Sequence, residues 1–386
     1  MRCSRSSGHE EKSRCRCTWP LAIAFLLTLA VTVILIFALG PIEQGVSKAM
    51  PHFEPINFKD DFTNPLPSTI APSASPVETT DPTYEFMQCP NDGGKCCNGL
   101  ESNCDLRLNE TVFAVAHNAM STEESGYQIG YNHYRNLDGA LRAGFRGLNL
   151  DVCKCKGKLS FCHTLCGYGD RDPAQVILEI EAFLDEHPTE FVVLVFQFST
   201  GSPTLAELFK VMKSVDGFVE KMYVFDSDNS KWPMMRDLIY GEEKKQILAF
   251  QHYANITCCQ HDANVTCSDA DSCPAQLHDY FHFTADTEYE FKTVAAMRDY
   301  ETSCKIDRGK TGLKNFLNVN SFVTPPNSIA AQEANNLGFA KERLSKCSSM
   351  TGLLPNFITV DFWSEGDLPQ LVQMVNREAY DVLEQS

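Results

Sequence analysis

The fold of this chain is decided by two pieces of sequence, TVFAVAHNAMS (residues 111–121) and GFRGLNLDVCKCKGKLSFCH (residues 144–163). They contain three apolar runs, residues 111–116, 147–150 and 159–162. Each run is too short for a helix and is bounded by turn residues, and both features are typical of strands. A polar residue follows every run. We therefore expect three strands that present polar side chains at their carboxyl ends.

Two of these polar residues are histidines. His117 follows the first run, Asp151 the second and His163 the third. Because an imidazole titrates near neutral pH, two histidines on neighbouring parallel strands suit a reaction that takes one proton and gives another. A single histidine after a strand is more often a loop or packing residue. The pair, with a carboxylate, an amide and an arginine between its members, favours a catalytic site.

These residues also carry a resemblance. His117-Asn118, GFRGLNLD (144–151) and Phe161-Cys162-His163 resemble the X-box of phosphatidylinositol-specific phospholipase C and its relatives, a superfamily of TIM-barrel phosphodiesterases. The similarity continues through PTEFVVLVFQF (188–198) to PNFITVDFW (355–363), and it is greatest to the X-domain proteins of plants and fungi. It implies an α/β fold of the TIM-type (β/α)8 barrel class and a phosphodiesterase function.

The resemblance assigns roles to three residues. His117 matches the general base that takes a proton from the inositol 2-hydroxyl, and Asp361 matches the acid that orients this histidine. His163 matches the general acid that protonates the departing oxygen. The alternative for Asp361 is a loop or helix cap, and the alternative for His163 is a structural role.

The calcium-dependent members of the superfamily suggest a metal site. Asn118 and Asp151 match calcium ligands of those enzymes, whereas Asn149 and Gln197 stand where they carry glutamates. Metal-free bacterial members have an arginine at the position of Asp151. Calcium prefers several carboxylate oxygens, so the sequence predicts a weak Ca²⁺ site or none.

Arg146 and Lys158 are the candidates for binding the phosphate of a substrate. The position of Arg146 in the family block is also typical of a structural ion pair. Lys158 lies with Lys154 and Lys156 in a stretch that is equally typical of a solvated loop.

The leading functional hypothesis is a phospholipase C-type phosphodiesterase that acts on a phosphoinositide-like or glycerophosphodiester substrate by His/His catalysis. The alternatives are a catalytically weak module that binds headgroups or glycan anchors on the same barrel, and a sphingomyelin or glycerophosphodiester hydrolase. The partner is then a lipid or another small phosphodiester. A formal net charge of -17 argues against a nucleic-acid partner. The sequence does not predict the oligomeric state.

The N-terminal part predicts a membrane attachment. Residues 1–20 form a basic tail, and residues 21–40 carry no charge over a length that suits a transmembrane signal anchor. Residues 41–87 are a stalk rich in Pro, Ser and Thr, and residues 88–386 form the barrel domain. We expect a single-pass type II membrane protein whose barrel is lumenal or extracellular. The alternative is a long cleaved signal peptide.

Cysteines and sequons agree with this topology. Of the seventeen cysteines, three precede the apolar run and fourteen follow it, which predicts disulfides in an oxidising compartment. Cys153, Cys155, Cys162 and Cys166 are expected to be bonded among themselves, and residues 89–104 form a second disulfide-rich segment. Zinc is the alternative for the clustered cysteines. Three sequons predict glycosylation at Asn109, Asn255 and Asn264.

The rest of the chain alternates strand and helix patterns, as parallel α/β folds do. Further strands are predicted at 191–198, 246–250, 313–320 and 356–362, and Met222–Phe225 is the candidate for an eighth. Helices are predicted at 173–187, 205–214, 326–345 and 368–383. A doubly wound sheet is the alternative fold, and the family resemblance favours the barrel.

Overall fold

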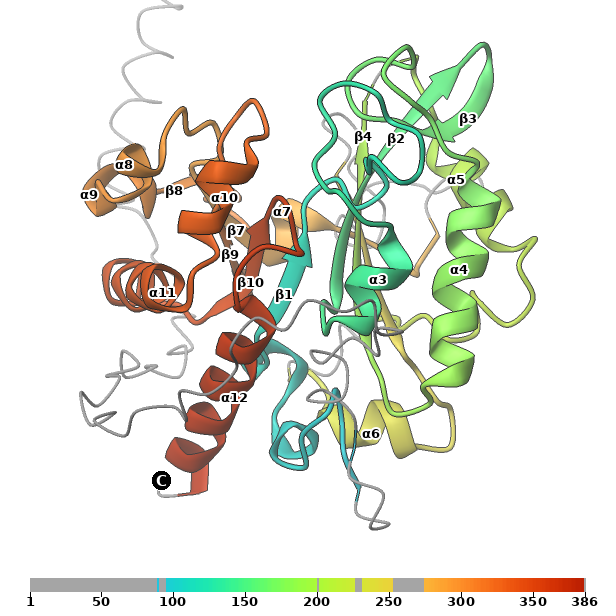
Figure 1. Cartoon of the computed structure of the whole chain (residues 1–386). Coiled ribbons are helices and arrows are strands. Elements are labelled where there is room, and N and C mark those ends of the chain that lie inside the picture. The colour runs from blue at the N-terminus through green and yellow to red at the C-terminus, as the bar shows by residue number, and fades with distance from the viewer. Residues whose placement is uncertain (1–88, 90–94, 200, 226–230, 253–273, 385–386) are drawn as a thin grey trace, which may run out of the picture. The chain divides into compact units, whose positions relative to one another are not determined.

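A computed structural model describes residues 89, 95–199, 201–225, 231–252 and 274–384 (Figure 1). These residues belong to one compact unit. The predicted tail, anchor and stalk lie outside them, as do Asn255 and Asn264. Across the described ranges, no helix combines the length and the apolar character that a membrane span needs.

The centre of the unit is a curled, mostly parallel sheet. Eight of its ten strands are parallel to their neighbours in the order β6-β5-β4-β2-β1-β10-β9-β7. Their bounds are β1 (Phe113–Ala116), β2 (Gly147–Cys155), β4 (Val192–Phe198), β5 (Ile247–His252), β6 (Leu277–Asp279), β7 (Thr284–Thr287), β9 (Phe316–Asn320) and β10 (Pro355–Val360). The first strand pairs with the last, as in a (β/α)8 barrel, so the strand order lacks the reversal of a doubly wound sheet. Within the described ranges β6 and β7 do not pair, so the ring is not closed there.

One predicted strand has the opposite direction. The run at residues 159–162 forms β3 (Lys158–Phe161), which is antiparallel to β2. The prediction that His117 and His163 follow neighbouring parallel strands is therefore wrong. Lys156 and Gly157 both adopt positive φ angles, 52° and 78°, and such a two-residue turn reverses the chain into a hairpin. Similarly, β8 (Ile306–Arg308) is antiparallel to β7.

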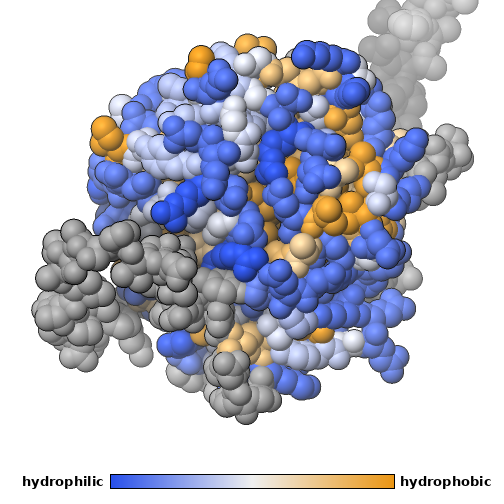
Figure 2. All heavy atoms as spheres, turned by 45° about the vertical axis from the view of Figure 1, so that its right-hand side comes forward, coloured by the Kyte–Doolittle hydropathy of each residue, from blue (hydrophilic) through white to orange (hydrophobic). Residues whose placement is uncertain are grey.

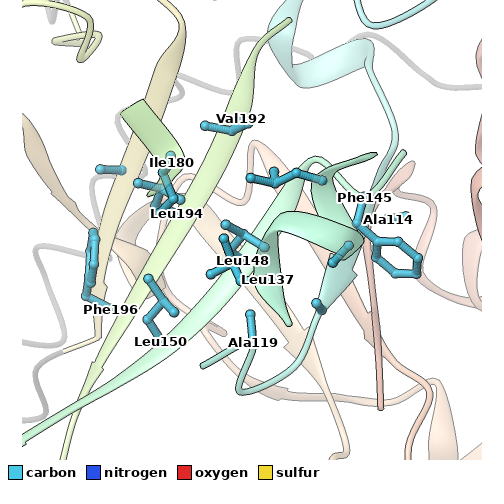
Figure 3. Close-up of a cluster of buried hydrophobic side chains, with 14 of the residues drawn as sticks. Ala114, Ala119, Leu137, Phe145, Leu148, Leu150, Ile180, Val192, Leu194 and Phe196 are labelled. Atoms are coloured by element: carbon cyan, nitrogen blue, oxygen red, sulfur yellow. The ribbon is translucent and has the colours of Figure 1, made fainter. Parts of the chain in front are cut away.

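The sheet separates two apolar clusters, because alternate side chains along a strand point to opposite faces. On the outer face, residues such as Leu148, Leu150 and Leu194 pack against helices (Figure 3). On the inner face, Phe113, Phe357 and other large side chains from the amino-terminal halves of the strands form the second cluster. The inner residues further along the strands are polar. The sheet interior thus changes from aromatic to polar toward the carboxyl ends of its strands.

Helices cover the outer face, with α11 and α12 on one side and α4 and α5 on the other (Figure 1). The helices are α3 (Leu137–Arg142), α4 (Pro173–Glu186), α5 (Leu205–Met212), α6 (Met235–Tyr240), α7 (Tyr280–Phe283), α8 (Val294–Met297), α9 (Tyr300–Ser303), α10 (Ser328–Ala334), α11 (Leu337–Thr351) and α12 (Leu368–Glu384). The 3-10 helices are η1 (Ser102–Asp105) and η2 (Leu108–Glu110). As predicted, Asp172 caps α4 by accepting the N–H of Ala174.

Two predictions about elements are wrong. The predicted helix 326–345 is two helices, because Asn335 ends α10 and Asn336 begins α11 by accepting the N–H of Gly338. Met222–Phe225 is not a strand, since only Met222 makes a bridge, to Ile247. The strands that complete the set of eight are β6 and β7, which have three and four residues.

The disulfide prediction is confirmed for the described cysteines. The hairpin carries Cys153–Cys162 and Cys155–Cys166, so the four clustered sulfurs are bonded to one another in pairs. The other described pairs are Cys89–Cys96, Cys97–Cys104 and Cys304–Cys347.

The described surface is mainly hydrophilic on the face drawn in Figure 2, with hydrophobic residues in smaller groups. Ile129 and Ile329 are the most exposed large aliphatic residues in the described part of the chain.

Candidate active site

The predicted catalytic residues meet at the carboxyl ends of the parallel strands. His117 follows β1 and Asp361 follows β10, and the two strands pair with Ala116 opposite Val360. His117 Nδ1 lies 3.0 Å from Asp361 Oδ1. The side chain of Asp361 is 3% exposed and that of His117 is 22% exposed. With Nδ1 donating to the carboxylate, Nε2 is the ring nitrogen left to exchange a proton with a substrate.

An aromatic ring supports His117 from one side. The ring of Phe322, which follows β9, stacks on the imidazole with the centroids 3.9 Å apart and the planes 16° apart. Stacking and the bond to Asp361 together restrict the imidazole, so His117 is held in one orientation.

His163 follows the hairpin strand β3 and is fixed from both sides. Its neighbour Cys162 is bonded to Cys153, and its own Nδ1 lies 2.9 Å from Gly130 O, to which it donates. Burial lowers the pKa of His163, and the nearby imidazole of His117 lowers it further. A lower pKa makes the protonated ring readier to give up its proton.

The predicted metal ligands also gather here. Asp151 is buried on β2, and burial raises its pKa to about 7, although His117 opposes this shift. Asn149 lies two residues earlier on the same face, and Gln197 on β4 is in register with Asp151. Asn118 has a positive φ of 48° and donates its N–H to Asn149 Oδ1 at 3.1 Å. Asn118 Oδ1 and Asp151 Oδ1 are buried without a hydrogen-bond partner among the described residues.

The two predicted phosphate-binding residues lie elsewhere. Arg146 precedes β2, at the amino-terminal end of the sheet, where its Nε donates to Glu190 at 2.7 Å and its Nη1 donates to Leu141 O at 2.5 Å. Both ion-pair partners are buried, which matches the structural alternative for Arg146. Lys158 is exposed at the start of β3. The structure brings neither side chain to the His117–Asp361 pair.

Sequence reasoning missed two site residues in the loop after β1. Asn132 Nδ2 donates to Asp361 Oδ1 at 2.8 Å, and His133 Nε2 lies 2.7 Å from His117 O. This loop has no strand or helix period, and it is separated from Asp361 by most of the chain. A single sequence therefore contains no signal that these residues meet.

The described sequon residue Asn109 lies in η2 at the other end of β1. Its side chain is half-buried, and the hydroxyl of the sequon residue Thr111 donates to Arg107 O at 2.9 Å. Glycosylation at this position stays a prediction.

Comparison with known proteins places this geometry in a family. The PI-PLC X family model (PI-PLC X 1) matches residues 103–376. This match includes β1 and β10 and every predicted catalytic residue. The chain belongs to the PI-PLC X family, and this membership supports a phospholipase C-like function in general.

Two curated relatives are X-domain proteins, as the resemblance predicts. PI-PLC X domain-containing protein 1 of Arthroderma benhamiae is 26% identical over 314 residues, which are 76% of this chain and 93% of that protein. A PI-PLC X domain-containing protein of Arabidopsis thaliana is 25% identical over 160 residues, which are 39% of this chain and 37% of that protein.

Among solved structures, the phosphatidylinositol-specific phospholipase C of Listeria monocytogenes aligns over 77% of this chain and 98% of its own, with a TM-score of 0.47 and 14% identity. A variant of the Staphylococcus aureus enzyme aligns over 71% of this chain and 96% of its own, with a TM-score of 0.44 and 12% identity.

Proposed function

We propose that this protein is a phosphodiesterase of the phospholipase C type, with His117 as general base and His163 as general acid. The observation that carries the proposal is the contact between His117 and Asp361 at the carboxyl ends of two adjacent strands, where Nδ1 and Oδ1 lie 3.0 Å apart. A carboxylate on Nδ1 holds the imidazole with Nε2 toward the substrate and stabilises the imidazolium that forms. Family membership supports the same class of reaction.

The reaction begins inside the substrate. A hydroxyl oxygen on the headgroup attacks phosphorus as its proton passes to Nε2 of His117. The bond from phosphorus to the leaving oxygen breaks, and this oxygen takes a proton from Nε2 of His163. The products are a cyclic phosphate and an alcohol, which is a neutral lipid when the substrate is a glycerophospholipid. His163 suits the acid role because its Nδ1 already donates to Gly130 O, which leaves Nε2 for the leaving group.

A weak Ca²⁺ site is part of the proposal. Asn118 and Asp151 would hold the ion, since each has a buried Oδ1 without a partner among the described residues. Asn149 contributes less, because its Oδ1 already accepts the N–H of Asn118. With one carboxylate, the donor set fits only a weakly bound ion, whose remaining ligands would come from water or substrate. Bound calcium would offset the negative charge of the phosphate.

A module that binds headgroups or glycan anchors with little catalysis is the second candidate. It is favoured by the positions of Arg146 and Lys158, because neither lies where it would stabilise the charge of a reacting phosphate. The paired histidines favour the enzyme.

A product assay on the purified full-length protein in detergent distinguishes the phosphodiesterase from the binding module. The substrates are phosphatidylinositol, a glycosylphosphatidylinositol, sphingomyelin and a glycerophosphodiester, each with Ca²⁺ and with a chelator. We expect a cyclic phosphate from an inositol substrate. Turnover of sphingomyelin or the glycerophosphodiester alone would change the substrate class, and binding without any turnover would replace the enzyme by the binding module.

We also propose that the protein is a type II membrane protein with a lumenal or extracellular barrel. The uncharged run at residues 21–40 and the disulfides of the barrel support this topology.

A further inference from the structure

Two neighbouring side chains from the loop between β1 and α3 contact both members of the His117–Asp361 pair. Asn132 and His133 are fully buried, at 0% exposure. Their backbone N–H groups both donate to Ser121 O, at 2.9 and 3.2 Å. The Asn132-His133 pair is thus held by the loop itself and extends from it to the ends of β1 and β10.

Asn132 acts on the carboxylate. Its Nδ2 donates to the same Oδ1 of Asp361 that accepts from His117, at 2.8 Å, and it lies 3.5 Å from His117 Nδ1. Asp361 Oδ2 has no partner among the described residues. Among the described residues, Asn132 therefore supplies one of the two hydrogen bonds that orient the Asp361 carboxylate, and His117 supplies the other. The backbone carbonyl of Asn132 also accepts the N–H of Phe362, the residue after Asp361, at 2.7 Å.

His133 acts on the backbone of both strand ends. Its Nε2 lies 2.7 Å from His117 O, and its Nδ1 accepts the N–H of Trp363 at 3.2 Å. Only a neutral ring with the proton on Nε2 satisfies both contacts. The imidazole of His133 thus joins the end of β1 to the chain that follows β10.

We propose that Asn132 and His133 are positioning residues, which hold the general base and its carboxylate at the distance and orientation that proton transfer requires. This inference rests on the proposed function. Asn132 orients the Asp361 carboxylate toward Nδ1 of His117, and His133 keeps the two strand ends in register. Neither residue contacts the reacting atoms.

The chain offers a matched control for each residue. The side chain of Asn335 also contacts the chain that follows β10. Its Nδ2 donates to the backbone carbonyls of Asp361 and Phe362, at 2.9 and 3.3 Å, and not to the Asp361 carboxylate. His278 is a buried imidazole that also lies between a backbone carbonyl and a backbone N–H, with the roles of its two nitrogens exchanged relative to His133. Its Nδ1 lies 2.9 Å from Ala249 O, and its Nε2 accepts the N–H of Phe225 at 3.0 Å.

The experiment compares Asn132→Ala with Asn335→Ala, and His133→Ala with His278→Ala, in the full-length protein in detergent. The kcat and KM of each variant on the substrate found for the wild type are corrected for its folded fraction. Asn132→Ala should lower kcat by about tenfold to hundredfold with KM nearly unchanged, which is the range that one hydrogen bond to a charged group supplies. His133→Gln, which keeps an amide donor for His117 O, should recover part of the activity that His133→Ala loses.

A readout without turnover is the Nδ1–H proton resonance of His117 in histidine-labelled protein. In Asn132→Ala this signal should weaken through faster exchange with water, and in Asn335→Ala it should not. If the wild type turns over no phosphodiester, the proposed function fails and the resonance alone tests the inference. Equal losses of kcat in Asn132→Ala and Asn335→Ala, or a resonance that is the same in both, would overturn it.

Discussion

Asp361 Oδ1 lies 3.0 Å from His117 Nδ1 across 244 positions of the chain. The contact depends on β1 pairing with β10, because this pairing puts the residues that follow the two strands beside each other. Gly147 on β2 contributes on the other side of β1, since a Cβ at this position would collide with Val115. The close packing of β10, β1 and β2 therefore determines where His117 and Asp361 lie relative to each other.

Replacing either histidine by alanine should reduce turnover. Because both act as protons move in the transition state, His117→Ala and His163→Ala should each lower kcat by about a hundredfold or more and change KM little. A substrate whose leaving group needs no proton should partly rescue His163→Ala but not His117→Ala. Steady-state kinetics on both substrates checks this. Equal rescue of the two variants would contradict the assigned roles.

The calcium proposal predicts a specific dependence on chelator. Asn118→Ala and Asp151→Ala should raise the Ca²⁺ concentration that gives half-maximal activity, because each removes an oxygen ligand. Lys158→Ala, on the exposed hairpin strand, is the control and should behave like the wild type. If chelator does not change the activity, the calcium proposal fails and the proposed roles of His117 and His163 are unaffected.

Reduction of the hairpin disulfides should destabilise the protein and lower its activity. Cys153–Cys162 and Cys155–Cys166 hold the segment between Asp151 and His163. Losing a native disulfide typically costs about 2 to 5 kcal/mol, so the melting temperature should fall after mild reduction. Mass spectrometry after alkylation identifies the reduced pairs. Quantitative alkylation of these four cysteines in the native, unreduced protein would show that the bonds are absent.

His133 should make folding stability depend on pH. Burial lowers its pKa to about 4, so the folded state favours the neutral ring. Between the ordinary value near 6.5 and about 4, the unfolded chain binds the proton more readily. The contribution of His133 is therefore complete above about pH 6.5 and is lost as the pH falls toward 4.

Chemical denaturation of the wild type and His133→Gln between pH 4 and 7 measures this contribution. The variant should show a smaller loss of stability toward low pH. Some loss should remain, because burial also lowers the pKa of His252 to about 4. Identical pH dependence in the two proteins would contradict the assignment.

The proposed topology predicts glycosylation and membrane integration. The full-length protein should carry mass that endoglycosidase removes, and it should resist extraction by carbonate. Asn109→Gln tests the sequon in the described part of the chain, and Asn255→Gln and Asn264→Gln test the others. An unglycosylated protein that carbonate releases would contradict the signal anchor.

Much of the candidate site was predictable from sequence because its polar residues come directly after strands. The motifs at His117 and His163 and the acid at Asp361 mark strand ends, and Phe113, Val115 and His117 share a face by simple alternation. The direction of β3 was missed, although Lys156-Gly157 is a hairpin turn. β6 and β7 were missed because three or four residues are too few to show a period.

Contacts between distant segments were not predictable. No pattern connects Asn132 or His133 with Asp361, because their side chains meet only after the whole sheet has formed. The same holds for Arg146, whose partner Glu190 lies at the base of the neighbouring strand. Both of its interpretations were consistent with the sequence, and only the positions of the strands distinguish them.

The pairing of the first and last strands also affects how the protein matures. As the chain leaves the ribosome, β1 and β2 emerge early, while β10 emerges only after every other strand of the sheet. Until then one edge of β1 has no partner, and His117 has no carboxylate. Such non-local pairing is slow to form, and an unpaired strand edge favours association with other chains. A nascent chain of this protein should therefore lack the His117–Asp361 contact, and keep an open edge on β1, until its final strand is added.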